Sequence, residues 1–141
     1  MPVRYFTEEI KFNLRNKRKI NRWINETIEN EKHLSGDINI IFTSDINILQ
    51  INKKHLSHNY YTDIITFDYC EGKYIQGDIF ISIDTVKNNS IRFNVLYEEE
   101  IHRVIIHGIL HLIGYNDKTE NEKAEMRQKE NFYLDRLKKL F

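Results

Sequence analysis

One stretch, residues 104–113, constrains the fold most, because it is apolar almost throughout and yet holds two histidines four residues apart. Residues at this spacing lie one turn from each other on the same face of an α-helix. A helix that is apolar nearly all round is a buried helix. His107 and His111 then each need a hydrogen-bond partner or a metal ion, since burying an unpaired polar group is costly. Gly114 follows where a helix typically ends in a left-handed residue.

The rest of the chain predicts an α+β domain with this helix at its centre, a mixed sheet of about four strands and about five helices. Alternating apolar and polar residues predict strands at residues 3–6, 37–43, 63–69 and 78–83. Helical spacing and caps predict helices at residues 17–33, 46–55, 84–92, 98–113 and 119–138. We expect Ser35 and Gly36 to end the first helix, and Gly72 and Gly77 to lie in the loop before the last strand.

Length and composition narrow the class of protein. The chain has 141 residues and a formal net charge of zero, which predicts a single domain over residues 1–141 and argues against a general nucleic-acid coat protein. Its single cysteine, Cys70, excludes a disulfide framework and a cysteine-based zinc ribbon. No apolar run reaches the ~18 residues that a membrane span needs, and the first residues lack the apolar core of a secretory signal. We therefore expect a cytoplasmic protein.

The two histidines and a nearby carboxylate predict a metal site. Two imidazoles one turn apart can each offer a ring nitrogen to one ion. A bend at Gly114 can return Asp117 to the open side of the same ion. Two histidines and one carboxylate, with a position left for water, are typical of a catalytic rather than a structural zinc site. The alternative, that His107 and His111 are hydrogen-bonded core residues, stays open at this point.

Gly108 carries two further indications. A zincin protease has a glutamate directly after its first histidine, as the base for the metal-bound water, so Gly108 argues against peptide hydrolysis of that type. A glycine inside a helix also costs ~1 kcal/mol relative to alanine. We expect the close approach of another backbone to account for it.

The motif His107-Gly-Ile-Leu-His-Leu-Ile-Gly-Tyr, followed two residues later by Asp117, resembles the signature of the bacterial YbeY family of single-strand-specific metallo-endoribonucleases. Three other stretches resemble segments of that family in the same order, namely Leu-Gln-Ile-Asn at 49–52, Thr-Asp-Ile-Ile-Thr-Phe at 62–67 and Gly-Asp-Ile-Phe-Ile-Ser at 77–82. The resemblance covers most of the chain, from about residue 38 to about residue 130.

The resemblance implies a zincin-like fold and one Zn²⁺ per chain, held by His107, His111 and Asp117. It implies cleavage of single-stranded RNA in 16S rRNA 3′-end maturation and ribosome quality control. The implied partners are the small ribosomal subunit and ribosome-associated proteins, without a membrane. By family position Asp63 is the candidate base, or a residue that orients a ligand.

This sequence departs from the family pattern at two positions. The commonest family motif has a histidine as the third ligand, where Asp117 offers a carboxylate oxygen that zinc also accepts. The family usually has an arginine six residues before the threonine equivalent to Thr62, where this chain has Leu56. The candidates to replace that arginine lie nearby, at positions 53–55 and 58, while Arg103, one turn before His107, can reach the mouth of the site or pair with a neighbouring glutamate. The full set of candidate RNA contacts is Lys53, Lys54, His55, His58 and Arg103, with Glu99 and Glu100 as the alternative partners of Arg103.

Two other classes of function remain open. One is a non-catalytic ribosome-assembly or RNA-binding factor whose metal only joins the helix to the following loop. The other is a different metal-dependent phosphoester hydrolase. Three ligands with an open position favour an enzyme, whereas the missing arginine favours the binding factor.

Overall fold

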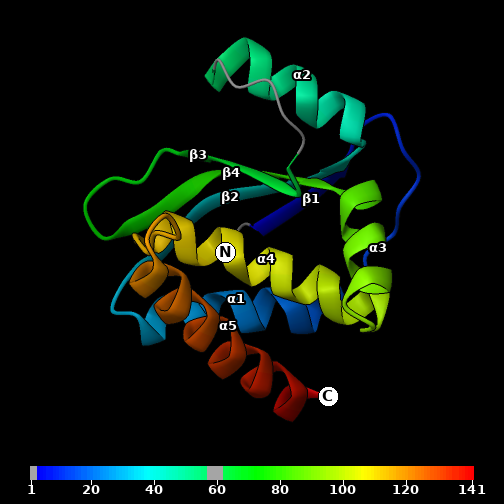
Figure 1. Ribbon diagram of the computed structural model, residues 1–141. Helices are drawn as coiled ribbons and strands as arrows, with labels where there is room; N and C mark the ends of the chain where they lie inside the picture. Colours follow the sequence, from blue (N-terminus) through cyan, green and yellow to red (C-terminus); the bar gives the residue numbers. More distant parts are fainter. Residues whose placement is uncertain (1–2, 57–61) are drawn as a thin grey trace.

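The computed structural model describes residues 3–56 and 62–141, in which five helices pack on one four-stranded mixed sheet (Figure 1). The strands are β1 (Val3–Thr7), β2 (Leu34–Thr43), β3 (Ile64–Asp68) and β4 (Tyr74–Ser82), in the order β1-β2-β4-β3. β1, β2 and β4 are parallel, and β3 is antiparallel to β4. The predicted α+β fold, with its mixed sheet and central histidine-bearing helix, is confirmed.

The helices form unequal layers on the two faces of the sheet (Figure 1). α1 (Lys17–Asn30) and α4 (Tyr97–Ile113) cover one face, with α5 (Glu120–Leu140) packed across them, and α2 (Asp45–Leu56) covers the other face. α3 (Ile83–Arg92) follows β4 directly and packs against α4. α4 thus lies between the sheet and α5, as its apolar sequence predicts.

The core that holds α4 in place is made chiefly of isoleucine. Ile79 and Ile81 of β4 are fully buried, as are Ile105, Ile106 and Ile109 of α4. Burying such a side chain contributes about 1.5–3 kcal/mol, so this contact between helix and sheet stabilises the position of both histidines. Among the described residues, no helix is both long and apolar enough to cross a membrane.

Gly108 lets α4 approach the sheet closely. A Cβ atom at this position would lie 2.8 Å from Cδ1 of Ile64 and 3.0 Å from Cγ2 of Ile79. The expectation that another backbone approaches here is therefore wrong, because the neighbours are two isoleucine side chains. Gly77 lies inside β4 rather than in the preceding loop, and there a Cβ would meet the carbonyl oxygen of Phe67.

The predicted break at Ser35 and Gly36 is also wrong. α1 ends at Asn30, and β2 already begins at Leu34, which pairs with Tyr74 of β4. The register shifts between Ser35 and Ile38, so the glycine serves a β-bulge within the strand. β2 begins earlier than its local sequence pattern predicts, because its first residues pair with β4, a strand about forty residues later in the chain.

Candidate metal centre

The three predicted ligands converge on one point. Nε2 of His107 and Nε2 of His111 are 3.0 Å apart, and Oδ2 of Asp117 lies 3.2 Å from the first and 3.3 Å from the second. Asp117 lies in the loop between α4 and α5. The loop turns at Gly114, whose φ of 126° is in the region that favours glycine, and the N–H of Tyr115 donates to the carbonyl of Leu110 in the final turn.

Hydrogen bonds at the other ring nitrogens set the tautomers. Nδ1 of His107 lies 2.6 Å from Oε2 of Glu130, and Nδ1 of His111 lies 3.0 Å from the carbonyl oxygen of Tyr115. Both partners are acceptors, so each Nδ1 carries a proton and each neutral ring presents a lone pair at Nε2. Three lone-pair donors then face one another across about 3 Å. Tetrahedral zinc with bonds of about 2.0–2.1 Å separates its ligand atoms by about 3.3 Å, so these residues fit such an ion.

Glu130 joins His107 to Arg103. Its side chain is only 6% exposed, and Oε1 accepts a hydrogen bond of 2.7 Å from Nη1 of Arg103. Burial opposes ionisation of Glu130, but the hydrogen bonds from His107 and Arg103 outweigh it and lower its pKa. An ionised carboxylate on Nδ1 makes the imidazole a stronger donor toward a metal.

The two histidines differ electrostatically. Burial lowers the pKa of His107, but the hydrogen bond and charge of Glu130 outweigh it, and the pKa of His107 is raised. Burial and the neighbouring charge of His107 lower the pKa of His111. His111 therefore stays neutral to lower pH than an exposed histidine, which keeps its nitrogen available to a metal.

Two carboxyl groups extend the acidic surroundings of the centre. Burial raises the pKa of the Asp63 side chain, although the charge of His107 opposes this. The backbone of Asp63 is held beside β4, because its carbonyl oxygen accepts a hydrogen bond from the N–H of Ser82. Glu100 lies seven residues before His107 on α4, is buried, and has a pKa raised by burial and then by Asp63. Both groups thus hold a proton at a higher pH than an exposed carboxyl does.

The sequence indicates Glu100 only as an alternative partner of Arg103, and it does not indicate Glu130 at all. Glu100 shares the helical stripe of His107, since seven residues make two turns, and that spacing is a signal that could have found it. Glu130 lies on α5, and no local pattern links it to His107.

The candidate RNA contacts are spread over two elements. Lys53, Lys54 and His55 form the exposed last turn of α2, and the His55 ring packs edge-on against Phe67 of β3, with centroids 5.8 Å apart. His58 lies outside the described residues. Arg103 pairs with Glu130 and, through Nη2, with Asn131 at 2.8 Å, rather than with either neighbouring glutamate. Among the described residues, the basic side chains closest in sequence to Leu56, the position of the family arginine, are therefore those at the end of α2.

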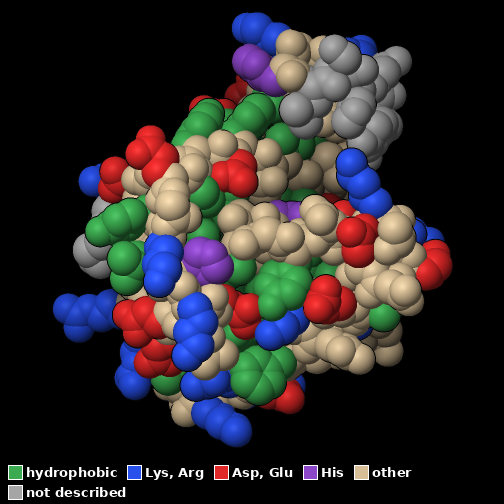
Figure 2. Space-filling model, turned by 90° about the vertical axis from the view of Figure 1, so that its left-hand side faces the viewer, with side chains coloured by type: hydrophobic (Ala, Val, Ile, Leu, Met, Phe, Trp, Pro, Cys, Tyr) green, Lys and Arg blue, Asp and Glu red, His purple; other side chains and the backbone are tan. Residues whose placement is uncertain are grey.

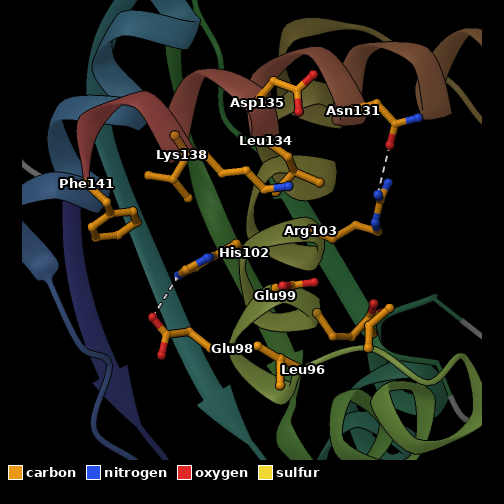
Figure 3. Close-up of a pocket in the computed structure, with 13 residues that line it drawn as sticks. Leu96, Glu98, Glu99, His102, Arg103, Asn131, Leu134, Asp135, Lys138 and Phe141 are labelled. Atoms are coloured by element: carbon orange, nitrogen blue, oxygen red, sulfur yellow. Dashed lines mark hydrogen bonds and ion pairs between the residues drawn. The ribbon is translucent and has the colours of Figure 1, made fainter.

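A separate cavity of about 640 Å³ lies between the first turns of α4 and the last turns of α5 (Figure 3). Arg103 and Asn131 line one side, and His102 and Phe141 lie on the other. Nε2 of His102 is buried without a hydrogen-bond partner, 4.0 Å from Oε1 of Glu98. None of the three candidate ligands lines this cavity, so the metal centre is a distinct site.

One face of the molecule is mixed in charge (Figure 2). Figure 2 shows acidic and basic side chains interspersed with histidines on one face, without a broad patch of either sign. The net charge of zero is therefore reflected locally on this face.

Comparisons with known proteins point to one family. A family model described as Endoribonuclease YbeY matches residues 3–138. Among curated proteins, an Endoribonuclease YbeY of Bacteroides fragilis is 52% identical over 131 residues, which cover 93% of this chain and 94% of the relative. One of Parabacteroides distasonis is 49% identical, over 93% of this chain and 92% of the relative.

A solved structure shares the fold. The solution structure of TM1509 from Thermotoga maritima superposes with a TM-score of 0.66 at 26% sequence identity, over 96% of this chain and 88% of that chain. The likeness thus extends over nearly the whole chain.

Proposed function

The chain belongs to the YbeY family of endoribonucleases, and from that premise we propose that it is a zinc-dependent endonuclease that cleaves single-stranded RNA. One observation carries the zinc dependence: Nε2 of His107, Nε2 of His111 and Oδ2 of Asp117 face one point at 3.0–3.3 Å, with both Nδ1 atoms already engaged.

The same proposal covers the biological setting. The enzyme acts in 16S rRNA 3′-end maturation and ribosome quality control, with the small ribosomal subunit and ribosome-associated proteins as partners. It works in the cytoplasm as one domain over residues 1–141. The family membership supports this part of the proposal.

In the proposed mechanism His107, His111 and Asp117 hold one Zn²⁺. When bound, zinc supplies a Lewis acid for the phosphodiester and lowers the pKa of coordinated water. Asp63, whose pKa burial raises, would accept the proton of the hydroxyl, of water or of the ribose 2′ position, that attacks phosphorus. The bond from phosphorus to the leaving ribose oxygen breaks, and that oxygen takes a proton from water. Glu130 keeps the Nδ1 proton on His107 and so directs Nε2 to the centre.

In this proposal, basic side chains bind the RNA substrate. Lys53, Lys54 and His55 are exposed on α2, where they can contact RNA phosphates in place of the arginine that Leu56 replaces. Arg103 is held by Glu130 and Asn131, so we assign its contribution to the orientation of His107 as well as to the phosphate charge.

The test is cleavage of matched single-stranded and double-stranded RNAs by protein with a measured zinc content. We expect about one zinc per chain and cleavage of the single strand only. His111→Ala removes both metal and cleavage, while Glu98→Ala, an exposed change on the same helix, leaves both unchanged. Cleavage that persists in His111→Ala would refute the assignment.

A non-catalytic RNA-binding factor is the second candidate, and Leu56 at the usual arginine position favours it. In that case zinc-loaded protein binds RNA without cutting it, and removal of zinc unfolds the chain. A general phosphoester hydrolase would instead cleave a small phosphodiester as readily as RNA.

A further inference from the structure

Glu31 lies just after α1 and joins three parts of the molecule through one carboxylate. Its side chain is only 9% exposed. Oε1 accepts a hydrogen bond of 2.6 Å from the hydroxyl of Tyr115, in the loop that carries Asp117. Oε2 accepts from Nζ of Lys129 at 3.1 Å and from the hydroxyl of Tyr133, both on α5.

Tyr115 transmits this contact to one histidine. Its hydroxyl is held by Glu31, its N–H donates to the carbonyl of Leu110, and its own carbonyl accepts the hydrogen bond from Nδ1 of His111. The residue that fixes the tautomer and orientation of His111 is therefore anchored at its ring and at its backbone. Without Glu31, the ring anchor is lost and the carbonyl can turn away from Nδ1.

The contacts of Glu31 with α5 affect the other histidine, His107. Lys129 and Tyr133 lie one residue before and three residues after Glu130, so each is within one turn of it on α5. Glu130 is the hydrogen-bond partner of Nδ1 of His107. The turn that presents Glu130 is thus tied to the end of α1 by the same carboxylate that anchors Tyr115.

We propose that Glu31 is a positioning residue of the metal centre, which orients His107 and His111 through Glu130 and Tyr115 without touching the ion. This inference rests on the proposed zinc site. The hydrogen bond that Glu31 accepts from Tyr133 persists around neutral pH, because burial raises the pKa of the Tyr133 hydroxyl to about 12. This donor therefore keeps its proton while the Glu31 carboxylate is ionised, since the hydrogen bonds to Glu31 outweigh its burial and lower its pKa.

The test measures zinc affinity and ligand geometry in four variants of the full chain, and urea denaturation gives the stability of each. Zn²⁺ affinity is measured by competition with a chromophoric chelator, and ligand geometry by the absorption spectrum of the Co²⁺-substituted protein. We expect Glu31→Gln and Tyr115→Phe to weaken zinc binding about tenfold or more and to change the Co²⁺ spectrum, as loss of an outer-shell partner does.

Two controls separate positioning from a general loss of stability. Ile20→Val removes a methyl group from a fully buried α1 residue and lowers stability without touching this network. Glu29→Gln changes an exposed glutamate two residues before Glu31. Both should keep the wild-type zinc affinity and Co²⁺ spectrum.

The outcomes distinguish the two proposals. Zinc affinity and spectrum unchanged in both Glu31→Gln and Tyr115→Phe would overturn the role of Glu31 alone, as would an equal loss in Ile20→Val. If Glu31→Gln does not fold, Tyr115→Phe decides. A wild-type protein that binds neither Zn²⁺ nor Co²⁺ would overturn the metal centre and the role of Glu31 together.

Discussion

At the scale of single residues, the chemistry of the centre depends on which nitrogen of each histidine carries the proton. A carboxylate oxygen of Glu130 and the carbonyl oxygen of Tyr115 hold the two Nδ1 protons, so both Nε2 atoms are free of protons when the rings are neutral. A metal ion and a proton compete for these atoms. The hydrogen-bond partners of the two Nδ1 atoms therefore matter to metal binding as much as the spacing of the histidines does.

Replacement of Glu130 tests this dependence. Glu130→Gln removes the charge that faces His107 and Arg103, and an outer-shell loss of this kind typically costs about 10–100-fold in metal affinity. The free energy of unfolding should also fall by about 2 kcal/mol, because a buried charged hydrogen-bond partner is lost. Zinc competition and urea denaturation measure the two effects. Glu120→Gln, an exposed change on the same helix, should move neither quantity, and an equal effect there would contradict the assignment.

The pH dependence of stability should show the ionised state of Glu31. Burial opposes its ionisation, but hydrogen bonds from Tyr115, Tyr133 and Lys129 lower its pKa below the usual value of about 4.3. The unfolded chain then binds the proton more readily, so the contribution of Glu31 is complete above that value and is lost as pH falls through the lower native pKa. We expect the difference in unfolding free energy between wild type and Glu31→Gln to be constant near neutrality and to shrink in acid. Urea denaturation across this range measures it, and a difference that grows in acid would contradict the hydrogen-bonding pattern.

The candidate ligands could be predicted from sequence because they are close together in the chain. His107 and His111 are one helical turn apart, and Asp117 follows the glycine that ends the helix. The residues that hydrogen-bond to these ligands or to the loop that carries them could not be predicted in this way. Glu130 meets His107 across 23 residues, and Glu31 meets Tyr115 across 84. Such contacts depend on how α1, α4 and α5 pack, which periodicity within each helix does not determine.

At the scale of elements, the unit formed by α4, its loop and α5 follows local rules closely. Gly114 ends α4 with a positive φ, and Thr119 is the N-cap of α5 and forms a capping box with Glu122. The strand predictions are less accurate where pairing is non-local. β2 starts before Ser35 and Gly36 because it pairs with β4 through a bulge. Local signals thus define the loop that carries Asp117 better than they define the sheet below it.

A glycine substitution tests whether the geometry of this loop sets metal affinity. Gly114→Ala places a side chain at a φ of 126°, which should lower the free energy of unfolding by at least about 1–2 kcal/mol. It should also weaken zinc binding, because the turn aims Asp117. Gly72→Ala is a matched control, since Gly72 also has a positive φ, of 57°, and also has open space around the Cβ position. Calorimetry and zinc competition should show similar destabilisation in both variants, with weaker zinc binding in Gly114→Ala only. Equal zinc affinities would mean that the turn does not position the ligand.

At the scale of the whole molecule, the metal centre and the hydrophobic core are separate sources of stability. The core is the contact of β2 and β4 with α1 and α4, and it is built from fully buried side chains such as Ile40 and Ile79. The three candidate ligands are only half-buried; His107 and His111 lie in the second half of α4, and Asp117 lies in the loop that follows it. An ion bound there would join α4 to the loop and would add nothing to the contact between the sheet and the helices.

Removal of zinc should therefore leave the chain folded. We expect chelated protein to keep its far-ultraviolet circular dichroism spectrum and a cooperative thermal transition, at a lower midpoint than the loaded protein. A ligand present at 100 times its Kd stabilises by about 2.7 kcal/mol, which sets the scale of the shift. Asp117→Ala, loaded under the same conditions, should melt close to the chelated wild type. A chelated protein that loses its helical spectrum would show instead that the ion is needed to fold the chain, and the non-catalytic factor would then be the better description of the molecule.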